Sequence, residues 1–119
     1  MLSIKNLSKE FPVEKGLFSR SNSTVKAVQN VSFDIKKNKV LGLVGESGSG
    51  KSTLGKTIMK LLNPTRGKIF FDNEEITQYN KRKMINVRKK LQMIFQDPFA
   101  SLNPRKNIFD TLSEPILVH

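Results

Sequence analysis

Residues 45–53 carry the glycines and polar side chains whose spacing in this sequence suits the binding of phosphate. The segment reads Gly45, Glu46, Ser47, Gly48, Ser49, Gly50, Lys51, Ser52, Thr53. Its first eight residues fit the Walker A pattern G-x-x-x-x-G-K-[ST]. Glycines in this pattern let the backbone curl so that successive amide groups point at phosphate oxygens. Lys51 then supplies a positive charge to the β- and γ-phosphates, and the Ser52 hydroxyl is placed to hold a bridging Mg²⁺.

The motif alone does not define a reaction. A glycine-rich turn that matches the pattern by chance is one alternative, and kinases, GTPases and transport ATPases all remain open. The pattern also demands a strand before the loop and a helix after it, and both are predicted. Val40–Val44 is apolar without alternation, as in a parallel strand covered on both faces. After the loop, apolar residues recur at helical spacing until Asn63-Pro64, which should stop the helix: Leu54, Ile58, Leu61, Leu62.

The residues before the loop predict an antiparallel pair of strands. A first strand begins at Leu2 and breaks up at Phe11-Pro12, and an exposed loop is expected over Glu14–Thr24. A second, half-buried strand follows, and the residues 36–39 make the next turn. Its inner face is predicted from an alternating set: Val25, Ala27, Val31, Phe33, Ile35.

The remaining residues predict two more strands and two more helices. Lys68–Phe71 forms a short strand that turns at Asp72-Asn73, so Asp72 is interpreted as a turn residue rather than as the Mg²⁺-binding aspartate of P-loop ATPases. Asn80 should cap a helix with inner positions Met84, Val87 and Leu91, and a further strand is expected over Leu91–Phe95. The last helix carries apolar residues between Ile108 and Leu117, with Pro115 kinking or ending it. Strands that alternate with helices predict an α/β fold.

Composition restricts the class of protein. The chain has 119 residues and a formal net charge of +11, with an apolar fraction sufficient for a core and no uninterrupted apolar stretch of membrane-spanning length. Absence of cysteine excludes disulfide scaffolds and thiolate metal sites, and the single histidine is His119. The basic run over residues 81–90 is interpreted as the solvated face of a short helix, with few aromatic residues beside it to stack on bases. A nucleic-acid partner is therefore not expected. A basic nucleic-acid-binding domain remains a hypothesis for the function of this chain, and it is the weakest of the three that the sequence allows.

Several segments together resemble the ATP-binding subunit of ABC transporters, in the branch that imports oligopeptides and dipeptides. The resemblance is carried by the residues 7–12, 26–33, 43–55 and 92–104, which touch almost the whole chain. It implies that 1–119 is the N-terminal portion of one nucleotide-binding domain. The implied fold is a P-loop NTPase core of the α/β class with an N-terminal antiparallel β element, lacking the C-terminal half of the domain. Nickel importers are related and are not separated from peptide importers by these residues.

The resemblance also implies roles outside the loop. Phe11 matches the aromatic residue that stacks on adenine, and Gln96 matches the glutamine whose amide oxygen reaches Mg²⁺ and the attacking water. Asp97–Asn103 matches the segment on which the membrane partner docks, so Phe99 and Leu102 are either interface anchors or part of a small separate core. The implied ligands are ATP and Mg²⁺, and the implied partners are a second ATPase subunit and the transmembrane permease subunits. The implied location is cytoplasmic and peripheral, on the inner face of the cell membrane.

Later motifs of that family have no counterpart in this sequence. It contains no Leu-Ser-Gly-Gly-Gln signature and no aspartate-glutamate pair that closes an apolar strand, and His119 lies too early for the switch histidine. No catalytic residue is therefore identifiable, and ATP hydrolysis by these 119 residues alone is not expected. The second hypothesis follows from this: a nucleotide-binding module without turnover. Uncovered strand edges should also favour aggregation, self-pairing or dependence on a complementing chain.

Overall fold

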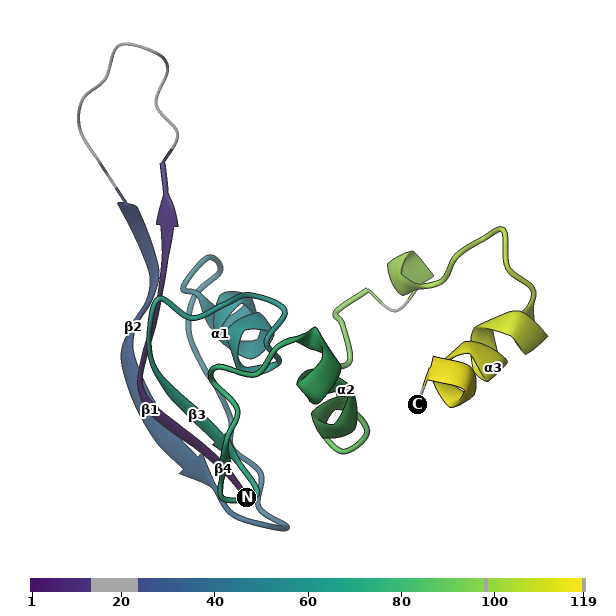
Figure 1. Cartoon of the computed structure of the whole chain (residues 1–119). Coiled ribbons are helices and arrows are strands. Elements are labelled where there is room, and N and C mark those ends of the chain that lie inside the picture. Colours follow the sequence, from purple (N-terminus) through teal and green to yellow (C-terminus); the bar gives the residue numbers. More distant parts are fainter. Residues whose placement is uncertain (14–23, 98, 119) are drawn as a thin grey trace. The chain divides into compact units, whose positions relative to one another are not determined.

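A computed structural model describes the residues 1–13, 24–97 and 99–118. The chain divides into two compact units, Met1–Tyr79 and Asn80–His119 (Figure 1). Of the predicted loop over Glu14–Thr24, only Thr24 lies inside the described residues, where it begins a strand.

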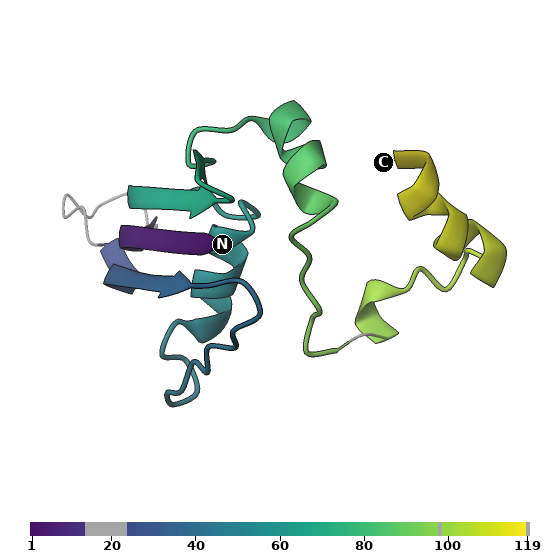
Figure 2. The same cartoon turned by 90° about the horizontal axis from the view of Figure 1, so that it is seen from below.

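The first unit is built on a four-stranded antiparallel sheet. Its strands are β1 (Leu2–Pro12), β2 (Thr24–Ile35), β3 (Arg66–Phe71) and β4 (Glu74–Glu75), in the order β2-β1-β3-β4. Figure 2 shows β1 between β2 and β3. The predicted antiparallel pairing of the first two strands is confirmed, with Ile4 opposite Phe33.

The core of this unit lies between the sheet and the helix α1 (Lys51–Ile58), which covers one face of the sheet (Figure 2). Ile4 and Ile69 are paired across β1 and β3, and both side chains are fully buried. On the helix, Leu54 and Ile58 supply the apolar stripe that the spacing predicted. Burial of each such side chain stabilises the fold by about 1.5–3 kcal/mol, so the site-bearing helix is fixed to the sheet by its own inner face.

A bulge changes the predicted inner face of β2. Asn6 and Asn30 both adopt left-handed backbone conformations, and the pairing shifts register around them. The Asn30 amide donates to Ser8 Oγ at 2.9 Å, which satisfies a group that the ladder leaves unpaired. An extra residue in a strand reverses the faces of the side chains on one side of it relative to those on the other, and before the bulge Val28 is buried and Val25 is 55% exposed. The predicted strict alternation from Val25 onward is therefore wrong before the bulge.

Two predicted strands, the parallel strand over Val40–Val44 and the further strand over Leu91–Phe95, are not formed. Residues 40–44 have no strand geometry, and Val40 and Val44 are 98% and 95% exposed. Residues 91–95 are likewise irregular, and Ile94 is 93% exposed. A parallel strand needs a neighbouring strand for its backbone hydrogen bonds and cover on both faces. Within the described ranges the sheet contains only antiparallel pairs, so neither apolar run has a ladder to join.

The helix α1 is shorter than predicted. It ends at Ile58 rather than at Asn63-Pro64, because Lys60 takes a left-handed conformation with φ of 55°. The Leu61 amide then donates back to the Lys56 carbonyl at 2.9 Å, which closes the helix end. Leu61 is consequently outside the helix and largely exposed.

The hairpin between β3 and β4 confirms the interpretation of Asp72. Asp72 and Asn73 have φ of 49° and 69°, the left-handed conformation of a two-residue hairpin turn. The Asp72 carboxylate is paired with the N-terminal ammonium of Met1 at 2.7 Å.

The second unit contains α2 (Lys81–Arg88), a 3₁₀ turn η1 (Phe99–Ser101) and α3 (Ile108–Val118). Asn80 caps α2 as predicted, since its Oδ1 accepts from the Lys83 amide at 2.9 Å. Met84 and Val87 are buried, whereas Leu91 lies beyond the end of the helix. The flanking residues Lys81, Arg82 and Lys83 are exposed, which confirms a solvated basic face.

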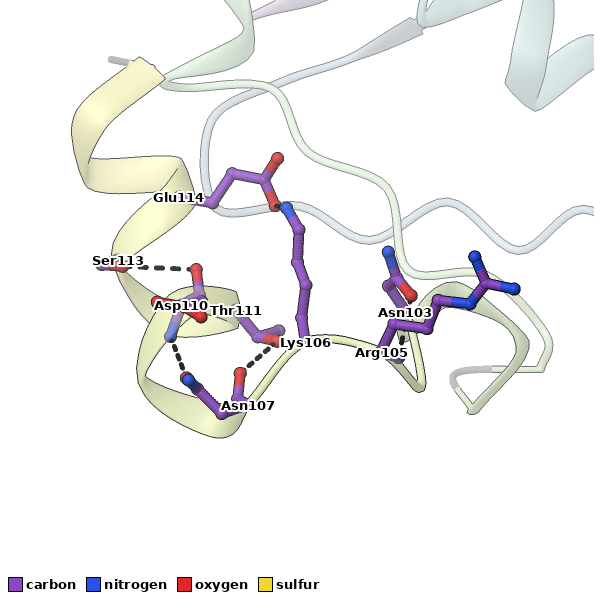
Figure 3. A network of polar contacts seen from close by, with 8 residues as sticks. All are labelled: Asn103, Arg105, Lys106, Asn107, Asp110, Thr111, Ser113 and Glu114. Atoms are coloured by element: carbon purple, nitrogen blue, oxygen red, sulfur yellow. Dashed lines mark hydrogen bonds and ion pairs between the residues drawn. The ribbon is translucent and has the colours of Figure 1, made fainter.

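Pro115 lies inside α3 and does not end it. The start of the helix is fixed by Asn107, whose Oδ1 accepts from the Asp110 amide at 2.7 Å (Figure 3). An ion pair of 2.7 Å joins Lys106 to Glu114 across the first two turns. No described residue of α3 is buried, so its apolar side chains remain exposed.

Candidate phosphate-binding site

Residues 45–50 form a tight loop that leads directly into α1. Gly48 and Gly50 have φ of 78° and 92°, a conformation that residues with a Cβ rarely adopt. The Ser49 amide donates to the Glu46 carbonyl at 3.2 Å, which closes a turn inside the loop. The predicted curling of the backbone at these glycines is confirmed.

Gly50 fits closely against β2. A Cβ at this position would lie 2.1 Å from the Ala27 carbonyl oxygen, so only glycine allows the loop to approach the strand this closely. The sequence pattern does not indicate a role for Ala27 in the site. Its neighbours in sequence give no signal of this contact, because the contact arises only when the loop packs on the sheet.

Lys51 folds back across the loop. Its Nζ atom donates to the Gly45 carbonyl at 2.6 Å and to the Glu46 carbonyl at 2.5 Å, and it lies 3.3 Å from Ser49 Oγ. A Cβ on Gly45 would meet Ser49 Oγ at 2.7 Å, so the interior of the loop is tightly packed on this side. The Lys51 ammonium is thus held by backbone carbonyl oxygens of the loop itself.

The N-terminus of α1 adds to the positive charge at the same place. Gly50 is the N-cap and provides no side-chain hydrogen bond, and the first turn contains no acidic residue. The first amides of the helix therefore have no intrahelical partner and favour an anion. Together with the Lys51 ammonium, this donor set fits the phosphate tail of a nucleotide.

A divalent cation would depend on few protein ligands here. No group of three or more acidic, histidine or cysteine side chains occurs among the described residues. The Ser52 side chain is exposed beside Lys51 at the start of α1. Mg²⁺ suits such a place, because it is commonly held by one or two protein oxygens together with substrate phosphates and water.

A hollow of about 390 Å³ lies beside the loop. The loop contributes Gly45, Ser49 and Lys51 to its lining, and β2 contributes Ala27 and Val28. Another part of the wall is formed by Leu43 and Val44, from the segment 40–44 that was predicted to be a strand. The loop therefore opens onto a space with both polar and apolar walls.

A family model described as ABC transporter matches residues 28–115, which is most of the chain. The chain belongs to the ABC transporter family. The predicted fold class, a P-loop NTPase core with an N-terminal antiparallel β element, agrees with solved members of this family. The dimeric ABC transporter cassette MJ0796 superimposes with a TM-score of 0.81 at 27% identity, covering 98% of this chain and 47% of that one. A structure of the same cassette bound to ADP and Pi gives a TM-score of 0.80 at 26% identity.

Curated relatives of this ABC transporter chain include import proteins. It is 48% identical over 120 residues to the oligopeptide transport ATP-binding protein AppF of Bacillus subtilis, covering 100% of this chain and 36% of AppF. Identity to OppF of Lactococcus lactis is 44%, covering 98% of this chain and 36% of OppF. Identity to the glutathione import ATP-binding protein GsiA of Escherichia coli is also 44%, covering all of this chain and 19% of GsiA. The chain thus spans little more than a third of the first two relatives.

Two predicted site residues of this ABC transporter chain lie away from the loop in sequence. Phe11 is half-buried near the end of β1, opposite Val25, and the Lys9 Nζ atom lies 4.8 Å from its ring centroid. Phe11 does not line the hollow beside the loop. Gln96 is exposed in the second unit, between α2 and η1. Their roles at adenine and at Mg²⁺ stay predictions.

Proposed function

We propose that this chain is part of the ATP-binding, energy-coupling subunit of an ABC importer for oligopeptides or dipeptides, and that its loop 45–53 binds Mg-ATP. The observation that carries the proposal is the position of the Lys51 ammonium, inside a glycine loop that leads into the N-terminus of α1, where no side chain caps the first amides. Similarity to AppF and OppF, which are oligopeptide transport ATP-binding proteins, supports the peptide cargo.

Each residue has a defined role in this proposal. The loop amides and Lys51 bind the phosphates, and Ser52 supplies a hydroxyl oxygen to Mg²⁺. Gln96 supplies an amide oxygen near the same ion, and Phe11 stacks on adenine. Bound Mg²⁺ would neutralise phosphate charge as bonds to the terminal phosphate break.

The proposed partners are a second ATPase subunit and the transmembrane permease subunits. The solved structure of the cassette MJ0796 is dimeric, which supports the first partner. Phe99 and Leu102 are 83% and 54% exposed, so they are not part of a small separate core in the described residues. Their exposure supports the alternative, an apolar surface for a permease subunit.

The proposed location is cytoplasmic and peripheral, on the inner face of the cell membrane. None of the helices in the described part of the chain has the length and apolar character to cross a bilayer. The proposal includes attachment to the membrane through the permease subunits.

Binding and turnover of Mg-ATP, measured on the same preparation, test the proposal. Complete members of the family are ATPases, whereas these residues include no candidate for the catalytic glutamate. We expect Mg-ATP binding with little hydrolysis by the 119-residue chain. Restoration of hydrolysis on addition of the remaining length of such a subunit supports the importer role. Binding that never leads to hydrolysis in that mixture supports a module without turnover instead.

A salt titration tests the remaining hypothesis of a basic nucleic-acid-binding domain. Binding driven by phosphate neutralisation weakens steeply as salt rises. We expect no measurable duplex-DNA affinity at about 0.15 M salt, a concentration at which charges beyond about 8 Å are screened. DNA binding with a steep salt slope that survives Lys51→Ala would favour the nucleic-acid role.

A further inference from the structure

A second hollow, of about 580 Å³, lies on the sheet and is separate from loop 45–53. It is lined by three cationic side chains, Lys5, Arg66 and Lys68, together with the polar residues Asn6, Ser8 and Asn30. No acidic residue is among its described lining residues. Because Ile4 and Ile69 point into the core and side chains alternate along a strand, Lys5 and Lys68 lie on the opposite face from α1.

The three cationic side chains of this basic hollow lie close together, and their mutual repulsion destabilises the sheet. Lys5 is directly opposite Lys68 in the β1–β3 pair, and Arg66 is two residues before Lys68 on the same face. Like charges directly opposite each other in an antiparallel pair destabilise the sheet. An anion between them would remove this repulsion.

The neighbouring residues neutralise the cluster only in part. Lys68 Nζ forms an ion pair with Glu75 at 3.1 Å, and the Lys5 Nζ atom lies 5.1 Å from the Phe70 ring centroid. Asp34 is opposite Ser3, further along the same face, and does not line the hollow. The Arg66 side chain makes no hydrogen bond or ion pair with any described residue, so its guanidinium donors are available to a ligand.

The backbone shapes the basic hollow. The β1–β3 register shifts between Lys5 and Ser8, where β1 contains more residues than the facing segment of β3. Such bulges bend a strand and re-aim its side chains. Gly67 has φ of 92°, and a Cβ there would lie 2.4 Å from the Asn6 carbonyl oxygen, so the strands meet closely beneath the hollow.

We propose that the basic hollow binds a phosphate-bearing anion, independently of loop 45–53. A guanidinium presents a planar pair of N–H donors that matches two phosphate oxygens, and lysine ammonium groups add charge from the sides. The side-chain amides of Asn6 and Asn30 can donate further hydrogen bonds. The same phosphate chemistry is offered by a free phosphate compound and by the headgroup of an anionic phospholipid.

The test uses the complete 119-residue chain carrying Lys51→Ala, which weakens the first phosphate site. Inorganic phosphate is titrated while the backbone amide NMR signals of Asn6, Asn30 and Gly67 are followed. We expect saturable shifts at these residues. Adding Arg66→Gln should weaken the affinity about tenfold or more, since one charge-assisted hydrogen bond accounts for a change of that size. Lys37→Gln, in the exposed turn after β2, is the matched control and should leave the affinity unchanged.

Vesicles distinguish the two sources of phosphate. Sedimentation with phosphatidylglycerol vesicles, but not with phosphatidylcholine vesicles, that is lost in Arg66→Gln supports a lipid headgroup. Saturable phosphate binding without vesicle binding supports a free phosphate compound. The proposal is overturned if neither probe binds, or if Arg66→Gln and Lys37→Gln weaken binding equally. A native-like amide spectrum of Arg66→Gln shows that any loss is not caused by unfolding.

Discussion

At the scale of single residues, Tyr79 makes the stability of the first unit depend on pH in the alkaline range. It is the single tyrosine of the chain, and its hydroxyl donates a hydrogen bond to the Glu74 carboxylate. This hydrogen bond, together with partial burial and the negative charge of Glu74, raises the pKa of Tyr79 above its usual 10.0. Because the folded pKa exceeds the unfolded one, the stabilisation is complete below pH 10 and is lost as pH rises through the folded value.

We therefore expect Glu74→Gln to lower the pKa of Tyr79 toward its usual value. Ultraviolet absorbance of the tyrosinate measures this titration directly, since the sequence contains no tryptophan and no other tyrosine. Glu75→Gln is the matched control, because Glu75 is paired with Lys68 instead. An equal shift in both variants would contradict the assigned hydrogen bond.

Substitutions at Gly48 and Gly50 distinguish destabilisation by backbone strain from destabilisation by steric contact. Both have positive φ, but only a Cβ on Gly50 meets another residue, the carbonyl of Ala27. Gly48→Ala should destabilise by about 1–2 kcal/mol through backbone strain. Gly50→Ala should destabilise more, by about 1–3 kcal/mol in addition, because β2 has to move. Urea denaturation measures both, and equal losses would contradict the close approach to β2.

At the scale of elements, one side chain extends the very short β4. The Ile69 amide of β3 donates to Thr77 Oγ1 at 2.8 Å, and Thr77 is almost fully buried. The side chain thus replaces a backbone partner where the two-residue strand has ended.

Thr77→Val should leave the Ile69 amide buried without a partner. The expected loss of unfolding free energy is about 1–3 kcal/mol, with faster hydrogen exchange at the Ile69 amide. Thr77→Ser keeps the hydroxyl and should protect that amide as in the natural sequence. Unchanged exchange in Thr77→Val would show that the hydroxyl is not the acceptor that matters.

Elements whose partners are near in sequence could be predicted, and elements that need distant partners could not. The hairpin at Asp72-Asn73 and the cap at Asn80 depend on local chemistry, and the structure contains both. The apolar run 40–44 indicates burial, but a sequence pattern does not specify which strands would lie beside it. The bulge at Asn30 was missed for a related reason, because its hydrogen bond to Ser8 joins residues from different strands.

In the candidate site, too, the features set by residues near in sequence could be predicted and those that need distant residues could not. Pattern and composition predicted loop 45–53 and its lysine, because consecutive residues make the cradle. The approach of Gly50 to Ala27 could not be predicted, since it depends on how α1 packs against the sheet.

At the scale of the whole molecule, exposed apolar side chains are expected to make copies of the chain associate in solution. Val40 and Val44 are almost fully exposed in a segment that the sequence marks as a buried strand. Apolar surface of this kind promotes association.

We expect the chain to self-associate as its concentration rises, and Val40→Ser with Val44→Ser to reduce this association. Sedimentation velocity measures the distribution of species. Leu61→Ser, at another exposed apolar residue, should have a smaller effect. A chain that stays monomeric at all concentrations would contradict the expected role of residues 40–44.

The central claim is that loop 45–53 binds the phosphates of Mg-ATP through Lys51, and calorimetric titration of the 119-residue chain with Mg-ATP tests it most directly. Lys51→Ala should weaken binding by about tenfold or more, because a charge-assisted contact is lost. Lys56→Ala, an exposed lysine on the same helix, should bind like the natural sequence. Absence of binding heat in the natural sequence, or equal affinity in all three proteins, would contradict the account.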